Sequence, residues 1–306
     1  MKKVRALVLF SGGLDSILAT KLLMEQGIKV EGLTLKSCFW KTDYAKEASK
    51  KLGIKLKIVD FSKEHLKMIK CPKHGYGKNM NPCIDCHSLM FKIAKSIMQK
   101  ENFDFVATGE VLGERPMSQN KNSLELIEKE SGLIGHLLRP LSAKLLESTE
   151  IEKKGLVDRE KLLDIRGRSR KKQLTLAKKW KIKDYPTPAG GCLLTDPEFS
   201  KRLRELLDKY PKILENDIKL LKIGRHFWNK GNKIIVGRNH KENLAIKRLR
   251  QKNDVLIELQ GLTGPTTLVR NYGKKISKEL IKKAKDLTKY YSLKARAKKD
   301  LKFKIF

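Results

Sequence analysis

The chain has 306 residues, 40% of them hydrophobic, and a formal net charge of +34. This hydrophobic content excludes a disordered polycation, and the length favours two domains over one. The charge is uneven, because residues 201–306 carry 30 Lys and Arg against 10 Asp and Glu. An excess of this size attracts polyanions and favours a nucleic-acid partner, although Lys-rich surfaces also occur in thermophiles.

The N-terminus shows no signal-peptide pattern. After Met1 and two lysines, only the short apolar run Val4–Phe10 precedes Ser11-Gly12-Gly13. No run in the sequence approaches the roughly 18 apolar residues of a membrane span. We therefore expect a cytoplasmic protein without a membrane partner; the sequence predicts no oligomeric state.

Strand and helix patterns alternate through the first 110 residues. The predicted strands and helices are, in chain order, Val4–Phe10, Leu14–Gln26, Lys29–Leu35, Tyr44–Leu52, Lys55–Phe61, Ile84–Lys100 and Phe103–Thr108. This alternation is typical of an α/β fold, a parallel sheet with helices on both faces. Such sheets bind ligands at the carboxyl ends of their strands.

The pattern changes in the second half of the chain. Residues 110–195 are less regular, and the segments after about residue 197 are short and basic. The predicted elements are a strand at Leu124–Ile127, helices at Arg170–Trp180 and Glu198–Lys209, strands at Lys233–Val236 and Val255–Leu259, and a helical tail at Ser277–Tyr291. We predict an α/β domain over residues 1–195 and a smaller basic α+β domain over residues 196–306.

The hexapeptide Ser11–Ser16 joins the first predicted strand to the first helix. Its sequence is Ser11-Gly12-Gly13-Leu14-Asp15-Ser16. Glycines allow close backbone approach to a phosphate, and the helix N-terminus and hydroxyl groups attract the charge. Asp15 is placed to hold Mg²⁺ against a pyrophosphate. The absence of Gly-Lys-Ser/Thr excludes a Walker loop, while an ordinary Gly-Gly turn with helix capping remains the simpler alternative.

The hexapeptide resembles the PP-loop of ATP pyrophosphatases, which transfer AMP to an acceptor oxygen and release pyrophosphate. This resemblance implies a fold like that of the adenine nucleotide alpha hydrolases. It also implies that ATP binds Ser11, Gly12, Gly13, Asp15 and Ser16. By position, Leu35 and Lys36 would border one side of the adenine, and Thr108-Gly109-Glu110 the other.

The five cysteines indicate sulfur or metal chemistry, because an odd number without an export signal argues against a disulfide framework. Cys83 and Cys86 stand in Asn81-Pro82-Cys83-Ile84-Asp85-Cys86-His87, and Cys192 follows Gly190-Gly191. Cys38, at a strand end, is expected to be a packed thiol. A helix N-terminus at Cys83–Cys86 would favour thiolates.

The cysteine pattern resembles that of tRNA 2-thiouridylases, in which an Asn-Pro-x-x-x-Cys cysteine and a downstream cysteine handle sulfur. Cys86 and Cys192 match these two catalytic positions, and Cys83 departs from the pattern. With Cys83 the set is similar to thiolases in which three cysteines hold a [4Fe-4S] cluster, leaving one iron free for sulfide. Two alternatives stay open, a metal-free persulfide pair of Cys86 and Cys192, and a Zn²⁺ site of Cys71, His74, Cys83 and Cys86.

Two further segments are similar to parts of known families. Thr108–Gln119 and Arg139-Pro140-Leu141 resemble 4-thiouridine synthases, where Arg115 and Arg139 would steady a phosphate or serve as structural arginines. Gly224–Trp228 and Gly237–Asn243 resemble the RNA-binding module of NFACT proteins. Arg225, Arg238 and Lys241 are the expected RNA contacts, and Phe227 and Trp228 are either stacking or core residues.

The combined prediction is an ATP-dependent tRNA sulfurtransferase. A nucleobase carbonyl oxygen, expected in uridine, would be adenylated and then replaced by sulfur from sulfide or a persulfide carrier. Asp15, Cys86 and Cys192 are the expected catalytic residues. A PP-loop amidating ligase and a non-enzymatic RNA-binding protein remain alternatives, the first disfavoured by the cysteines and the second by the intact hexapeptide.

Overall fold

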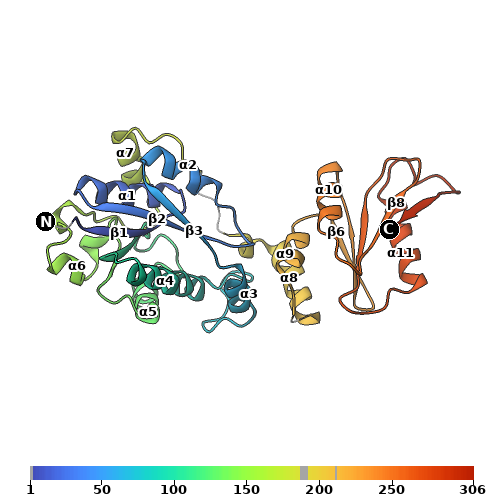
Figure 1. Ribbon diagram of the computed structural model, residues 1–306, viewed down its shortest axis with the longest axis horizontal. Helices are drawn as coiled ribbons and strands as arrows, with labels where there is room; N and C mark the ends of the chain where they lie inside the picture. The colour runs from blue at the N-terminus through green and yellow to red at the C-terminus, as the bar shows by residue number, and fades with distance from the viewer. Residues whose placement is uncertain (1–2, 187–191, 211) are drawn as a thin grey trace. The chain divides into compact units, whose positions relative to one another are not determined.

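The computed structural model describes residues 3–186, 192–210 and 212–306. The chain divides into two compact units, Met1–Thr195 and Asp196–Phe306 (Figure 1). No helix in the described part of the chain is long and apolar enough to cross a membrane.

The first unit is built on a five-stranded parallel sheet in the order β3-β2-β1-β4-β5. Its elements are β1 (Arg5–Leu9), α1 (Leu14–Glu25), β2 (Lys29–Lys36), α2 (Asp43–Leu52), β3 (Lys55–Asp60), α3 (Ser62–Lys70), α4 (Cys83–Lys100), β4 (Phe105–Thr108), α5 (Lys121–Ser131), β5 (Leu137–Leu138), α6 (Glu150–Lys153) and α7 (Lys171–Lys179). The predicted α/β architecture is confirmed, and the strands and helices expected up to Thr108 are all present.

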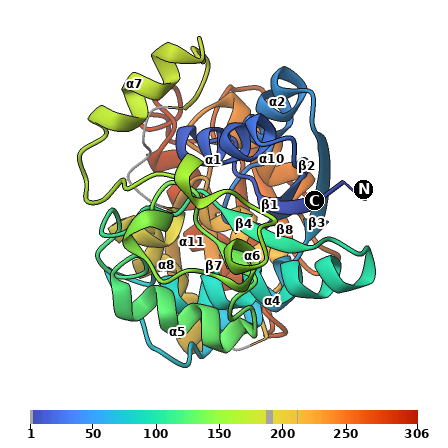
Figure 2. The same cartoon turned by 90° about the vertical axis from the view of Figure 1, so that its left-hand side faces the viewer.

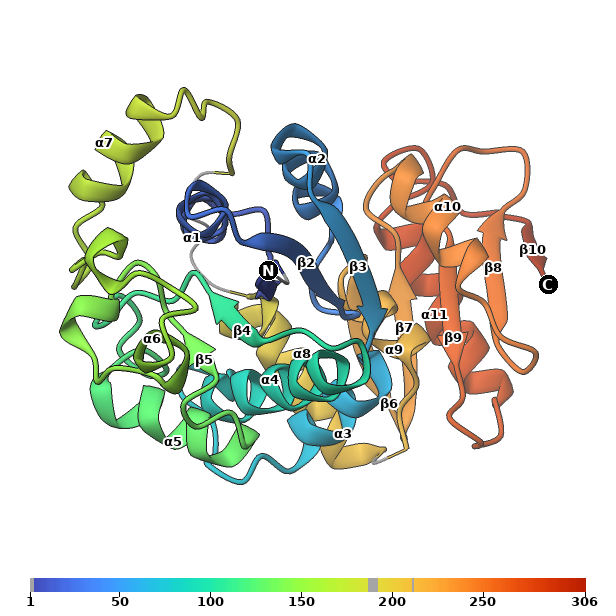
Figure 3. The same ribbon diagram turned by 60° about the vertical axis from the view of Figure 1, so that its left-hand side comes forward.

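Helices cover both faces of this sheet (Figures 2 and 3). Side chains alternate along β1, so that Ala6 and Val8 pack with Leu23 of α1 on one face, while Leu7 packs with Phe91 of α4 on the other. The alternation buries Ala6, Leu7 and Val8 at the centre of the sheet. The loops at the carboxyl ends of the strands are thereby held at one edge.

One predicted strand is wrong. Leu124–Ile127 lies within helix α5, which Asn120 caps by accepting a hydrogen bond from the Ser123 N–H. Leu124 and Ile127 are three residues apart and both buried, which is the spacing of a helix face. The strand was predicted from the short apolar run alone, without the Asn120 helix cap that precedes it.

The second unit has a five-stranded antiparallel sheet in the order β10-β8-β9-β7-β6. Its elements are α8 (Pro197–Lys209), α9 (Glu215–Leu221), β6 (Arg225–Asn229), β7 (Asn232–Val236), α10 (His240–Arg248), β8 (Val255–Leu259), β9 (Thr267–Arg270), α11 (Lys278–Tyr290) and β10 (Phe303–Ile305). Ile234 and Val236 pack against α11, and Ile235 packs against α9 and α10. The sheet is therefore covered on both faces.

Candidate active site and nucleic-acid interface

The hexapeptide Ser11–Ser16, called the phosphate loop below, keeps its shape through internal hydrogen bonds. The Gly13 N–H donates to Ser11 Oγ (3.2 Å), and the Ser16 hydroxyl donates to the Gly13 carbonyl (2.8 Å). Gly13 is the N-cap of α1 and provides no capping side chain, so the first-turn amides of α1 are open to an anion. This is the arrangement that a phosphate group binds.

Two glycines allow close backbone approach around the loop. Gly12 has φ +77°, and a Cβ there would collide with the Tyr44 carbonyl group at the start of α2. Gly109 follows β4, and a Cβ on it would lie 2.6 Å from the Asp15 carbonyl carbon and the Ser16 nitrogen. Gly109 thus lies against the phosphate loop. Leu35 and Thr108, near the ends of β2 and β4 on the two sides of β1, are buried.

Asp15 forms an ion pair that the sequence analysis did not predict. The Arg170 guanidinium, at the N-cap of α7, lies 3.0 Å from Asp15 Oδ2. Burial raises the pKa of Asp15, although Arg170 opposes the shift. Burial and the charge of Asp15 also raise the pKa of Glu114. Asp15 of the phosphate loop therefore lies near a second carboxylate, Glu114, and is paired with one arginine.

The structure brings the three expected sulfur residues together. Cys83 and Cys86 occupy the first turn of α4. The segment after Cys192 contacts the loop that precedes α4, through a hydrogen bond from the Met80 N–H to the Leu194 carbonyl (3.2 Å). Cys192 Sγ lies 3.7 Å from Asn81 Oδ1. Burial raises the pKa of all three thiols, and the charges of Cys192 and Cys83 raise that of Cys86 further.

The three thiols do not converge on a single ion. No group of three or more His, Cys, Asp or Glu in the described ranges is close enough to hold one metal ion. The proposed zinc set is not gathered, because Cys71 is exposed and the His74 ring contacts Glu130 (2.9 Å). Cys38 is buried, as expected for a packed thiol. Gly190 and Gly191 lie outside the described residues.

The loop before α4 is fixed by one acidic residue of that helix. The backbone N–H groups of Lys73 and His74 donate to the two carboxylate oxygens of Asp85, each at 3.0 Å. Asp85 is almost fully buried in the first turn of α4. It therefore fixes this loop to the helix that carries Cys83 and Cys86.

Cys86 contacts a buried histidine that the sequence analysis missed. His65 Nε2 lies 3.4 Å from Cys86 Sγ, and His65 Nδ1 lies 2.7 Å from Ser37 Oγ. The His65 ring stacks on Phe61 and is fully buried, and this burial lowers its pKa to about 4. Ser37 directly follows β2, so this contact places Cys86 at the carboxyl edge of the sheet.

A second histidine links α4 to the end of β4. His87 Nδ1 lies 2.7 Å from Glu110 Oε1, and Arg139 Nε donates to Glu110 Oε2 (3.1 Å). Burial opposes ionisation of Glu110, but His87 and Arg139 outweigh it and keep its pKa below the ordinary value. Arg139 is buried and also pairs with Glu128, so its role in the structure is to hold this network.

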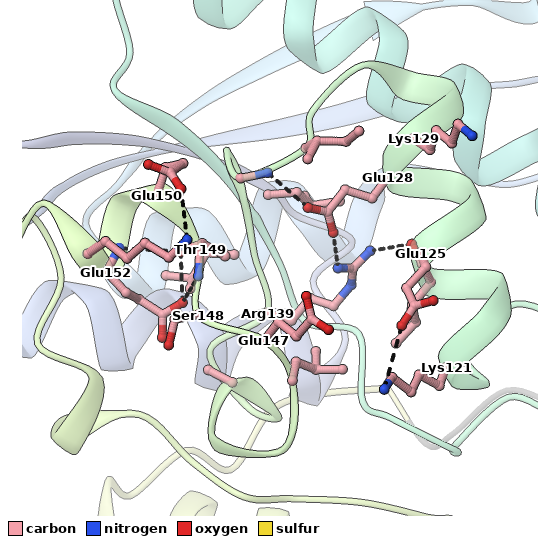
Figure 4. Close-up of a pocket in the computed structure, with 18 residues that line it drawn as sticks. Lys121, Glu125, Glu128, Lys129, Arg139, Glu147, Ser148, Thr149, Glu150 and Glu152 are labelled. Carbon is pink, nitrogen blue, oxygen red and sulfur yellow. Dashed lines mark hydrogen bonds and ion pairs between the residues drawn. The ribbon is translucent and has the colours of Figure 1, made fainter.

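A pocket of about 430 Å³ lies between α5, β5 and α6 (Figure 4). Arg139 and Glu128 face it, together with side chains of both charges from α5 and the segment before α6. Neither the phosphate loop nor any cysteine lines this pocket. It is therefore separate from the candidate active site.

The three expected RNA contacts lie on the second unit. The Arg225 guanidinium lies 4.4 Å from the centre of the Tyr291 ring. Arg238 remains about half exposed while its Nε donates to Glu242 Oε1 (2.9 Å), which raises its pKa. Lys241, in the first turn of α10, is exposed. These cations are available to a polyanion.

The two aromatic residues of β6 pack within the second unit. Phe227 lies in the core cluster under α11. Trp228 Nε1 donates to Glu205 of α8 (3.1 Å), and the buried Lys233 ammonium lies 4.6 Å from the centre of the Trp228 ring. Trp228 therefore serves as a partly buried bridge between α8 and the sheet.

Two known families match separate parts of the chain, one in each of the two units. Residues 4–149 match the family described as tRNA methyl transferase HUP domain. Residues 224–305 match the family described as NFACT protein RNA binding domain. The first unit is thus similar to a HUP domain over residues 4–149, and the second unit is similar to an NFACT RNA binding domain over residues 224–305.

Among curated proteins, the chain is similar to tRNA-specific 2-thiouridylases. It is 28% identical to MnmA of Pseudomonas fluorescens over 249 residues, which are 74% of this chain and 60% of that protein. It is 38% identical to MnmA 2 of Fusobacterium nucleatum over 117 residues, 36% of this chain and 34% of that protein. The chain spans about 60% of the length of the Pseudomonas relative it matches.

One similar solved structure is described as a 4-thiouridine synthetase–RNA complex with bound ATP. It has a TM-score of 0.37 and 22% identity, and the match covers 70% of this chain and 53% of that chain. At this TM-score the likeness adds no argument about the site.

Proposed function

We propose that this protein is an ATP-dependent tRNA sulfurtransferase, which adenylates a carbonyl oxygen of a nucleobase, in uridine, and replaces it with sulfur. The observation that carries the proposal is the position of two sites at one sheet edge. Gly109 lies against Asp15 of the phosphate loop, and its neighbour Glu110 contacts His87, the residue after Cys86. The proposed phosphate site and the proposed sulfur site are thus joined by a short series of contacts.

The phosphate loop supports the first half of the reaction. The open amides at the start of α1 and the hydroxyl groups of Ser11 and Ser16 would bind the phosphates of ATP, with the adenine bordered by Leu35 on one side and Thr108 and Gly109 on the other. Asp15, with Glu114 nearby, would hold Mg²⁺, which is usually bound through one or two carboxylates and the substrate phosphates.

The chemistry follows from the poor leaving ability of a carbonyl oxygen. The nucleobase oxygen attacks the α-phosphorus, the bond from that phosphorus to the bridging oxygen breaks, and pyrophosphate leaves. A sulfur nucleophile at the cysteine site then attacks the carbon, and the carbon–oxygen bond breaks as AMP leaves with the oxygen. Asp15, Cys86 and Cys192 are the proposed catalytic residues.

The donor set at the cysteine site fits a [4Fe-4S] cluster. Cys83, Cys86 and Cys192 are three partly buried thiols near one another, without the single-ion geometry that zinc requires. Cys83, Cys86 and Cys192 would hold such a cluster, which would supply an iron site without a protein ligand for sulfide. Burial disfavours three uncompensated thiolates, and the positive irons would offset that cost.

The second unit would bind tRNA through its basic surface. The net charge of +20 over residues 201–306 supports this role, as does the exposure of Lys241 and Arg238. The sulfur would come from sulfide or a persulfide carrier. The proposed reaction takes place in the cytoplasm, where tRNA is found.

The test uses the full-length protein with tRNA, Mg-ATP and sulfide under anaerobic conditions. We expect tRNA-dependent release of pyrophosphate and a thiolated nucleoside detected by mass spectrometry. An ATP analogue with a methylene bridge between the α and β phosphates should block both, whereas a β,γ-methylene analogue should support thiolation and release methylenediphosphonate in place of pyrophosphate. Formation of AMP and pyrophosphate without any thionucleoside, or intact thionucleosides in tRNA from a deletion strain, would contradict the proposal.

A further inference from the structure

Ser37, His65 and Cys86 form a buried series of side-chain contacts, and the positions of the hydrogens within it can be deduced. Ser37 is 4% exposed and His65 is fully buried, so each polar hydrogen of these two side chains needs a protein acceptor. The Phe39 N–H donates to Ser37 Oγ (3.3 Å). Ser37 Oγ therefore already accepts one hydrogen bond from the backbone.

The hydroxyl hydrogen of Ser37 has one available acceptor. In the described part of the chain, the only other group that contacts Ser37 Oγ is His65 Nδ1, at 2.7 Å. If His65 Nδ1 carried a hydrogen, Ser37 Oγ would accept twice and its own hydrogen would be buried without a partner, which is costly. The Ser37 hydroxyl therefore donates to His65 Nδ1.

This fixes the tautomer of His65, because a neutral imidazole with a bare Nδ1 carries its hydrogen on Nε2. His65 Nε2 lies 3.4 Å from Cys86 Sγ. We propose that His65 is a positioning residue, which donates its Nε2–H to the sulfur of Cys86 and holds that sulfur at the three-cysteine site.

The surroundings keep the imidazole in this orientation. The ring stacks on Phe61 with centroids 4.8 Å apart and packs edge-on against Phe39 with centroids 5.2 Å apart. An N–H donated to a ligand sulfur orients the ligand, as outer-shell partners commonly do for metal-bound residues. The hydrogen bond itself stands on the geometry alone, whereas its meaning for sulfur transfer rests on the proposed function.

The tautomer is tested by nitrogen NMR of the full-length protein labelled with ¹⁵N in histidine, without iron reconstitution. The chain has six histidines, and the spectrum of His65→Phe identifies the His65 signals by their loss. We expect His65 with a protonated Nε2 and a bare Nδ1 at neutral pH. A proton on Nδ1, alone or together with Nε2, would overturn the proposal.

Ser37→Ala removes the hydroxyl donor and should shift His65 toward a mixture of tautomers. Ser88→Ala is the matched control, because Ser88 is a buried serine of α4 and its hydroxyl has no hydrogen-bond partner in the described part of the chain. It should leave the His65 signals in place. An unchanged tautomer in Ser37→Ala would mean that Ser37 does not set it, and the deduction would be wrong.

A second measurement concerns the cysteine site. His65→Phe should weaken iron retention against a chelator by about 10–100-fold, whereas His65→Gln, which keeps a terminal N–H, should retain most of it. Equal losses in both variants would reduce His65 to a packing residue and overturn the positioning role. A wild-type protein that never holds iron would contradict the cluster in the proposed function, and the NMR result would still decide the hydrogen bond.

Discussion

The phosphate loop and the cysteine site lie at the same sheet edge but are built in opposite ways. The loop uses consecutive residues, Ser11–Ser16, and presents backbone groups. The cysteine site joins Cys83 and Cys86 to the distant Cys192, and burial raises the pKa of each thiol. The loop therefore depends on backbone geometry, whereas the cysteine site depends on groups that offset the burial of sulfur. Substitutions at the two sites should fail in different ways.

The largest effect is expected from the cysteines. Replacing Cys83, Cys86 or Cys192 with Ala should lower tRNA thiolation by at least about 10³-fold, since each change removes a residue of a group that acts as a unit. Tight binding of ATP should persist, because the phosphate loop is unchanged. Cys71→Ala is the matched control and should remain active, as Cys71 is exposed and outside the set. Activity in Cys192→Ala with loss in Cys71→Ala would reverse the assignment.

Substitutions that disturb the backbone of the phosphate loop should abolish its function. Gly12 and Gly27 have nearly the same φ, +77° and +75°, but only Gly12 has the Tyr44 carbonyl where a Cβ would lie. Gly27→Ala should cost about 1 kcal/mol of stability and leave ATP binding intact. Gly12→Ala should cost more and abolish ATP binding while the iron content of the protein is retained. Calorimetric titration with ATP and thermal melts distinguish the two, and equal ATP affinity in both variants would contradict the site.

Asp15 is expected to support activity while lowering the stability of the fold. Its folded-state pKa is raised above the ordinary value of 3.8, so the native state loses stability as the pH rises from 3.8 to the raised pKa, and the loss is complete above it. Asp15→Asn should therefore raise the Tm at pH 7, and the difference should shrink as the pH falls toward 3.8. Pyrophosphate release should fall sharply at the same time. A lower Tm for Asp15→Asn at pH 7 would mean that the Arg170 pair outweighs the burial of Asp15.

The same contrast explains what could be predicted from the sequence. The hexapeptide and the strand–helix alternation are local, and they predicted the parallel sheet. Arg170 and His65 could not be found this way, because the first reaches Asp15 from 155 residues away and the second reaches Cys86 from 21 residues away. The position of Ser37 after β2 and of Glu110 after β4 was visible, but their partners depend on how α3, α4 and β5 pack.

Trp228 shows a different limit. Aromatic residues on a basic strand predict either stacking on a base or a place in the core, and the sequence left both open. The structure gives Trp228 a hydrogen bond to Glu205 and a cation against its ring, both of which come from other elements. Local composition cannot supply these contacts, and the exposed cations of the same unit are better candidates for nucleic acid.

The smallest expected effect concerns Arg238 in the second unit. Its guanidinium is about half exposed and keeps one partner, Glu242, so it is free to contact a phosphate at the surface. Arg238→Gln should weaken tRNA binding modestly and reduce the slope of log affinity against log salt by about 0.7–0.9, the value for one phosphate contact. Arg238→Lys retains the charge and should preserve the slope, which separates electrostatic contact from loss of packing. Binding measured at three or more salt concentrations decides the matter, because identical slopes for Arg238→Gln and the wild-type protein would remove Arg238 from the interface and leave Arg225 and Lys241 to be tested in the same way.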